Sequence, residues 1–174
     1  MLSVLLSKIH RHELGGKNVE FKRVLFLKKQ MLEKISTQCR DMSEEEIFAL
    51  DSLTLAYMGD VCWSFFIRRR LIETGICHVQ ILHNLAAEIV SAKIQSQIFF
   101  DLKDMLSERE LKVCKRVRNA HSTVPKSATV EEYREATAFE GLLGYLYLSG
   151  QEERLQFFMK KALAVVIKEL KSNK

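Results

Sequence analysis

The sequence is poor in the residues that interrupt helices. Its 174 residues include one proline and seven glycines, whereas leucine, lysine, glutamate, alanine and isoleucine are abundant. Glycine and proline are the strongest breakers of regular structure, so their scarcity favours long helices. No segment shows a strand pattern that competes with the helical one, and no internal repeat is present. The composition therefore predicts an all-α fold.

Other absences exclude whole classes of protein. No stretch reaches about 18 apolar residues without charge, which argues against a membrane span. The opening MLSVLLSKIHRH has a short apolar part followed by its charges, unlike a secretory signal. The four cysteines, at positions 39, 62, 77 and 114, form no CxxC pair and have no histidine at ligand spacing. We therefore expect reduced, buried thiols in a cytoplasmic protein and no zinc site.

The charge is moderately basic and uneven along the chain. The net charge is +5 and the pI is about 9.0, which permits nucleic-acid binding without establishing it. Residues 1–30 carry seven lysines or arginines against Glu13 and Glu20. We predict a basic N-terminal arm over residues 1–42, including a helix over 19–37, and the main domain over 43–174. The arm could add phosphate contacts or be a mobile tail.

Start signals divide the main domain into helices. Ser43, Ser107 and Thr129 are each followed three residues later by glutamate, which is the capping-box pattern. The first box opens a helix that leads into an apolar run, for which Gly75 supplies the stop. The other expected elements are an amphipathic helix, continuous or broken, over 78–105, a basic helix over 107–119, a loop over 119–128, a helix from Thr129 to Ser149-Gly150 and a C-terminal helix over 151–171.

Two acids lie inside apolar segments. LTLAYMGDVCWSFFIRRRL contains Asp60, and EATAFEGLLGYLYL contains Glu140. A helix that is apolar nearly all round is typical of a buried, central position. Neither acid has a lysine or arginine three or four residues away. A carboxylate removed from water without a partner costs several kcal/mol or takes up a proton, so each acid needs a partner from outside its own helix.

Small residues beside the acids suggest what that partner is. Gly59 and Gly141 would let the two helices approach closely and bring both carboxylates to one point. Converging carboxylate oxygens suit Mg²⁺ or Mn²⁺ better than zinc, and such an ion would keep both acids ionised. Together with a basic surface this predicts metal-assisted phosphodiester hydrolysis. The alternative that these residues leave open is a helical interaction domain whose acids have only structural partners.

Several segments resemble a known family. LAYMGDVCW resembles the signature helix of the ribonuclease III catalytic domain, and ATAFEGLLGYLYLSG is similar to its second acidic helix. HNLAAEIVSAKIQSQ, VRNAHSTVPKSATVEEYREATAFE and GYLYLSGQEERL resemble the compact bacterial branch called Mini-ribonuclease III. The resemblance covers about residues 46–170, with the motifs in the same order. No double-stranded RNA-binding domain follows, which is also similar to the Mini branch.

The resemblance implies a homodimeric, Mg²⁺-dependent endoribonuclease that cleaves double-stranded RNA, with Mn²⁺ as a possible substitute. It implies Asp60 and Glu140 as catalytic residues and metal ligands, products with 5′-phosphate and 3′-hydroxyl ends, and precursor 23S ribosomal RNA as the substrate. Full-length ribonuclease III enzymes have further acids at the positions of Leu53, Ala56 and Thr137, which leaves the number of metal ions open. An inactive ribonuclease III fold acting as an RNA-binding or ribosome-associated module is the alternative.

A basic segment supplies candidate RNA contacts. The basic helix leads towards the Glu140 helix, where the resemblance places RNA; the alternative is an ordinary solvated face. Duplex RNA hides its base edges in a deep, narrow groove, so we expect contacts to phosphates and 2′-hydroxyls. The candidates are Lys93, Lys112, Lys115, Arg116, Arg118, Asn119, His121 and Lys126. His83, by contrast, is predicted to be a structural histidine.

The distribution of apolar residues also predicts self-association. The helices flanking Asp60 are apolar on more faces than one small domain can readily cover, which indicates a buried two-fold interface.

Overall fold

The computed structural model describes residues 16–37, 42–121 and 123–172. The chain divides between Asp41 and Met42 into two compact units, each of which is described by itself. Every regular element in these ranges is helical, so the predicted all-α fold is confirmed. None of the described helices is long and apolar enough to cross a membrane.

The first unit contains α2 (Gly16–Thr37), close to the predicted helix over 19–37. Its described side chains, residues 20–35, are all exposed, including those of Phe21 and Ile35. The described part of this unit therefore buries none of its apolar side chains.

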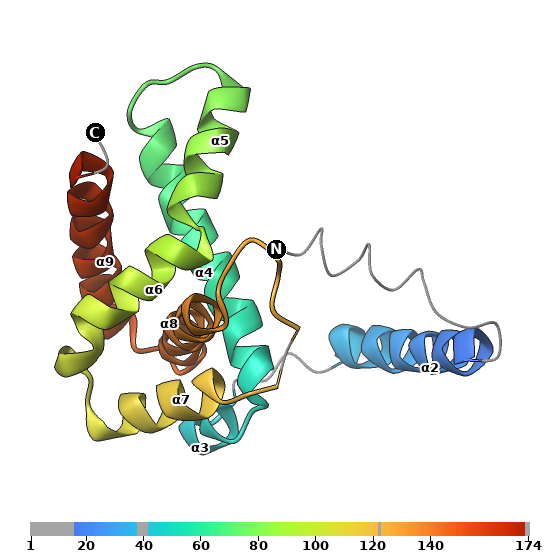
Figure 1. The fold of residues 1–174 in the computed structure, drawn as a ribbon. Coiled ribbons are helices and arrows are strands. Elements are labelled where there is room, and N and C mark those ends of the chain that lie inside the picture. Colours follow the sequence, from blue (N-terminus) through green and yellow to red (C-terminus); the bar gives the residue numbers. More distant parts are fainter. Residues whose placement is uncertain (1–15, 38–41, 122, 173–174) are drawn as a thin grey trace. The chain divides into compact units, whose positions relative to one another are not determined.

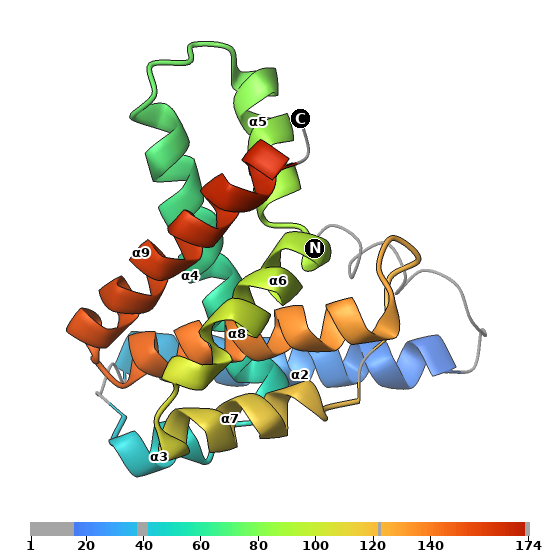
Figure 2. The ribbon, with the colours of Figure 1, turned by 60° about the vertical axis from the view of Figure 1, so that its left-hand side comes forward.

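The second unit is a bundle arranged around α8 (Figures 1 and 2). Three helices, α4, α6 and α7, pack on α8, and α9 packs on α6 and α8. The largest fully buried side chains include Trp63, Phe139 and Phe158. In chain order the elements are α3 (Glu44–Phe48), α4 (Ser52–Ile72), α5 (Val79–Ile89), α6 (Ala92–Leu102), the 3₁₀ turn η1 (Lys103–Met105), α7 (Glu108–Arg118), α8 (Val130–Leu148) and α9 (Glu152–Ser172).

The three predicted capping boxes are present. Ser43, Ser107 and Thr129 each accept a hydrogen bond from the backbone N–H three residues on, and the glutamate there accepts one from the capping residue's N–H. These bonds satisfy two N–H groups that an uncapped helix leaves without partners. The sequence signals therefore located the beginnings of α3, α7 and α8.

The prediction that the Ser43 helix leads into the apolar run is wrong, because α3 ends at Phe48. Asp51 starts α4 afresh, since its carboxylate accepts hydrogen bonds from the N–H groups of Leu53 and Thr54. The predicted helix over 78–105 is broken, because Ser91 caps α6 through the N–H of Ile94. A hydroxyl or carboxylate that binds the backbone locally competes with a continuous helix.

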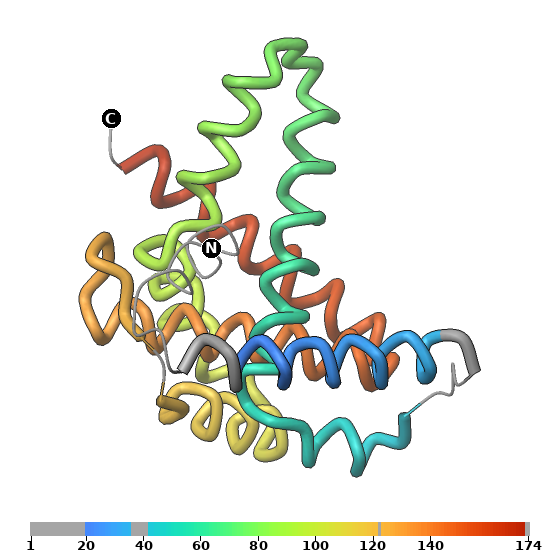
Figure 3. Tube along the Cα trace, turned by 90° about the vertical axis from the view of Figure 1, so that its right-hand side faces the viewer, coloured from blue at the N-terminus to red at the C-terminus, as the bar shows by residue number. Residues whose placement is uncertain are grey.

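Two glycines with positive φ follow the helix ends where stops were expected. Gly75 has φ +78° three residues beyond α4, and Gly150 has φ +67° two residues beyond α8. A side chain at either position would strain the backbone. After Gly75 the chain returns as α5, which lies beside the outer half of α4 (Figure 3).

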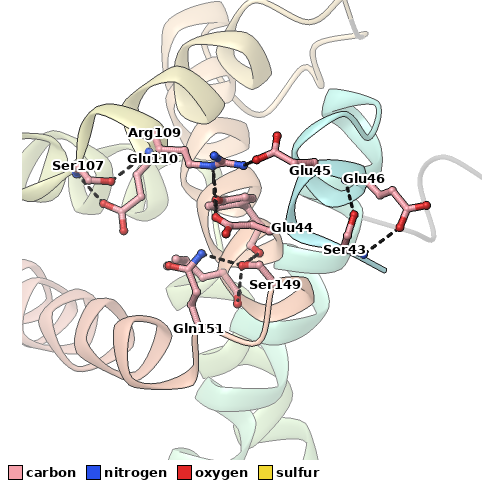
Figure 4. Close-up of polar contacts among 11 residues, drawn as sticks. Ser43, Glu44, Glu45, Glu46, Ser107, Arg109, Glu110, Ser149 and Gln151 are labelled. Carbon is pink, nitrogen blue, oxygen red and sulfur yellow. Dashed lines mark hydrogen bonds and ion pairs between the residues drawn. The ribbon is translucent and has the colours of Figure 1, made fainter. Parts of the chain in front are cut away.

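A polar network fastens α3 and α7 to α8 (Figure 4). The Arg109 guanidinium donates to the hydroxyl of Tyr145, which donates to Glu44, and Arg109 also pairs with Glu45. The next residue of α7, Glu110, pairs with Arg154 of α9 at 2.7 Å. These contacts join the ends of four helices, α3, α7, α8 and α9. The middle of α8 packs against α4 and α6.

Candidate active site

Helices α4 and α8 cross with their backbones in direct contact. A Cβ atom added to Gly59 would lie 1.7 Å from the carbonyl oxygen of Glu140, and one added to Gly144 would lie 2.0 Å from that of Leu55. No side chain fits at either position. Asp60 directly follows Gly59, and Glu140 is itself the residue that Gly59 contacts, so the crossing brings the two acids together.

The structure corrects one part of the expected crossing. Gly59 was predicted to face the other acidic helix and does so, but Gly141 faces α7 instead. A Cβ atom added to Gly141 would lie 2.6 Å from Cγ2 of Val117. Successive residues of a helix are about 100° apart, whereas residues four apart share a face. The glycine of α8 that meets α4 is therefore Gly144, one turn after Glu140.

Burial divides the two acids into an inner and an outer one. The Glu140 side chain is 5% exposed, whereas Asp60 is half-buried and therefore less embedded than its apolar run suggested. Burial, and then the charge of Asp60, raise the pKa of the Glu140 carboxyl to about 8, although the side-chain amide of Gln95 opposes this rise. No ion pair among the described residues includes either acid. The described residues therefore supply no cationic partner for either acid.

The two acids fit a hard divalent cation. They offer oxygen donors only, and a cation between them would oppose both burial and the charge of Asp60, the two influences that raise the pKa of Glu140. Residues 16–37, 42–121 and 123–172 contain no group of three or more His, Cys, Asp or Glu residues that could hold a metal ion. Two of the positions where full-length ribonuclease III enzymes have further acids are occupied here by Ala56 and Thr137, and both residues are buried. The hydroxyl of Thr137 donates to the carbonyl of Tyr133. At the crossing, the described part of the chain thus offers two carboxylates, those of Asp60 and Glu140.

Sequence reasoning missed one polar residue at this site. Gln95 is 1% exposed and lies on the buried face of α6 with Ile94, Ile98, Phe99 and Leu102. Among the residues that the structure describes, its Nε2 has no hydrogen-bond partner. The sequence does contain a signal for this residue, because Gln95 has the helical spacing of the buried apolar residues of α6.

The candidate RNA contacts fall into two groups. Two arginines have partners within the domain: Arg118 pairs with Glu135 of α8, and the Arg116 guanidinium lies 5.4 Å from the ring centre of Phe48. Two of the nitrogens of Arg116 are buried. The exposed candidates are Lys93, Lys112, Lys115, Asn119, His121 and Lys126.

The exposed candidates on α7 form one row. Lys112, Lys115 and Asn119 recur at spacings of three and four residues, which places them on the same face. His83 is also exposed, so the prediction that it is a structural histidine is wrong.

The cysteines only partly follow expectation. Burial raises the pKa of the Cys114 thiol, and raises that of the half-buried Cys62 to about 11. Cys77 is exposed, and Cys39 lies outside the described residues. A raised thiol pKa means little thiolate, so neither Cys62 nor Cys114 is suited to act as a nucleophile.

Comparisons with known proteins identify the family of this chain. Residues 53–151 match the Ribonuclease III domain family, and that range contains both acids. The domain therefore belongs to the ribonuclease III class of endoribonucleases. Mini-ribonuclease 3 of Brevibacillus brevis is 44% identical over 130 residues, which are 72% of this chain and 97% of that protein. The chain belongs to the Mini-ribonuclease 3 family.

Two further comparisons support that conclusion. Mini-ribonuclease 3 of Symbiobacterium thermophilum is 46% identical over 114 residues, covering 65% of this chain and 88% of that protein. A crystal structure of a Fusobacterium nucleatum protein is similar with a TM-score of 0.62 and 34% sequence identity. It covers 70% of this chain and 94% of the crystallised one. The resemblance stated from sequence motifs is thereby confirmed.

Proposed function

We propose that the chain cleaves double-stranded RNA with Mg²⁺, or Mn²⁺ in its place, bound by Asp60 and Glu140. Ribonuclease III enzymes act on double-stranded RNA and generally depend on divalent metals, as the family match implies. The observation that carries the proposal is the pair of acids at the α4–α8 crossing, which have no cationic partner among the described residues. Precursor 23S ribosomal RNA in the cytoplasm is the proposed substrate.

The two acids have different parts in the proposed mechanism. A bound ion would supply a more acidic water and offset charge on the phosphate. Glu140 is enclosed by the core, so it would contribute to the site from the buried side. Asp60 is half-exposed and belongs to the side from which RNA would approach. Hydrolysis with water attacking phosphorus and the 3′-oxygen leaving would give 5′-phosphate and 3′-hydroxyl ends.

Basic side chains would position the duplex. Lys112, Lys115, Asn119 and Lys126 are exposed on or just after α7, the helix that packs beside the Glu140 helix. Lysines without a fixed partner suit phosphates, and an amide suits a 2′-hydroxyl. We assign catalysis to residues 43–174, and leave 1–42 as a basic arm that could add phosphate contacts.

A homodimer would match the two strands of the substrate. The outer side of α4 exposes four large apolar residues, Tyr57, Val61, Phe65 and Ile72, with Phe65 70% exposed. A second copy meeting this stripe about a two-fold axis would present one site to each strand.

Cleavage of a structured duplex RNA, with Mg²⁺ and then with EDTA, tests the proposal. Wild-type protein should cut only with metal, and Asp60→Asn or Glu140→Gln should reduce cutting by about a thousandfold or more while helical content remains. Glu131→Gln, an exposed acid at the start of α8, is the control that should cut normally. Near-normal turnover in either site variant would refute the assignment. Binding without cutting by the wild type would instead identify an inactive module.

A further inference from the structure

Gln95 is a buried amide in an otherwise apolar layer. It lies on α6, which packs against α8, and its side chain is among the largest that are fully buried. Its Nε2 has no hydrogen-bond partner within the described parts of the chain. A buried donor without a partner costs about 1–3 kcal/mol, so packing alone would favour leucine or methionine at this position. The amide therefore calls for a function.

The Glu140 carboxyl is the group on which this amide acts. Among the influences on Glu140, the side chain of Gln95 is the one that favours the ionised form through hydrogen bonding, whereas burial and Asp60 oppose ionisation. The contact falls short of full hydrogen-bond geometry, because Nε2 is still without a partner. A donor that lies beside a buried carboxylate and has no partner among the described residues is suited to a bond that forms when the carboxylate becomes fully charged and fixed.

We propose that Gln95 is a positioning residue for the metal site. Its Nε2–H group donates to one oxygen of Glu140 when the site holds its ion, which leaves the other oxygen turned to the metal. Carboxylates that bind metals are themselves commonly hydrogen-bonded, and these partners set their orientation. The inference rests on the proposed role of Glu140 and adds a residue from a third helix, so that α4, α6 and α8 would build the site together.

The rival explanation is that Gln95 only fills space between α6 and α8. Gln95→Met separates the two, because methionine is similar in length and flexibility but has no donor. A space-filling role predicts little change in metal affinity. A positioning role predicts a change in metal affinity and no loss of stability without metal, since an unpaired buried amide is removed.

The test measures Mn²⁺ binding to the full chain without RNA, by electron paramagnetic resonance of the free ion. Gln95→Met should weaken Mn²⁺ binding by about tenfold or more. Its melting temperature in EDTA should equal or exceed that of the wild type, and its cleavage should recover at higher Mg²⁺. Gln97→Met is the matched control: Gln97 lies on the same helix, is half-buried and donates to Asp101 at 2.9 Å. It should bind Mn²⁺ as the wild type does.

A second measurement uses the wild-type protein alone. The side-chain amide resonance of Gln95 should move on titration with Mg²⁺, and that of Gln97 should not. Unchanged Mn²⁺ affinity in Gln95→Met, or a resonance that ignores Mg²⁺, overturns the inference and leaves the proposed function intact. If Glu140→Gln also binds Mn²⁺ normally, the metal site itself is wrong, and the role of Gln95 fails with it.

Discussion

The α4–α8 crossing and the exposed face of α7 differ in how tightly the fold determines their residues. At the crossing, backbone touches backbone at Gly59 and Gly144, and Glu140 is enclosed. On α7, Lys112 and Lys115 extend into solvent and form no ion pair among the described residues. Close packing tolerates few residue types at a position, whereas a solvated face tolerates many. The proposed function thus places the chemistry in the constrained region and substrate binding in the adaptable one.

Breaking the crossing should have the largest effect. Gly144→Ala places a methyl group 2.0 Å from the carbonyl oxygen of Leu55, so the helices must separate. We expect a loss of about 3 kcal/mol or more in the free energy of unfolding, although alanine has the better helix propensity. Urea denaturation measures this loss.

Gly141→Ala provides the graded comparison. The three atoms nearest to its added methyl group all belong to the side chain of Val117, which can shift more readily than backbone, so its loss should be smaller. Equal losses in the two variants would mean that the backbone contact at Gly144 is not what restricts the crossing.

The next largest effect is expected on the exposed side of α4, the helix whose other side packs against α8 at the crossing. Phe65→Asp places a charge in the apolar stripe, and Phe65 also lines a shallow hollow with Ile72. Light scattering at micromolar concentration should give about twice the 20.2 kDa chain mass for the wild type and about the chain mass for the variant.

Phe100→Asp is the matched control for that surface. Phe100 on α6 is 60% exposed, yet it lies outside the stripe and its ring contacts Lys103. It should leave the mass of the assembly unchanged. A monomeric wild type would contradict the proposed dimer directly.

The two regions also differ in how far the sequence predicted them. The capping boxes and the all-α fold could be predicted, because each rests on local hydrogen bonding or on one helix's own periodicity; the role of the two acids stays a prediction. The glycine partner on α8 could not, since it depends on how α8 rotates between α4 and α7. The same holds for Arg118, whose pairing with Glu135 joins two helices. Contacts set by inter-helix geometry are not readable from a single helix's pattern.

The α7 face should give a moderate effect that depends on salt. Replacing Lys112 and Lys115 together by alanine should weaken duplex RNA binding several-fold. Each lost phosphate contact should reduce the slope of log affinity against log salt by roughly 0.7–0.9. Arg116 is left unchanged because it packs on Phe48. Binding is measured in EDTA to prevent cleavage.

The control pair for α7 is Lys160 and Lys161, which are exposed on α9. Their replacement by alanine should change the slope little. If the α9 pair flattened the salt dependence as much as the α7 pair, the RNA footprint would have to be moved to α9.

The last prediction concerns the crossing itself, where the raised pKa of Glu140 should make stability depend on pH. The pKa of Glu140 is raised to about 8, above its ordinary value of 4.5, so the folded chain keeps a proton that the unfolded chain releases between these values. Stability without metal should therefore fall as pH rises from about 4.5 to about 8, and then level off.

Glu140→Gln carries no such proton, so in EDTA it should melt at a higher temperature than the wild type. The difference should grow from pH 5 to pH 8, as the wild type loses the stabilising proton. Mg²⁺ should stabilise the wild type more than the variant, because the ion binds the ionised carboxylate. A difference in melting temperature that stayed constant across this pH range would show that Glu140 keeps an ordinary pKa, and that Asp60 and burial do not act on it as the crossing implies.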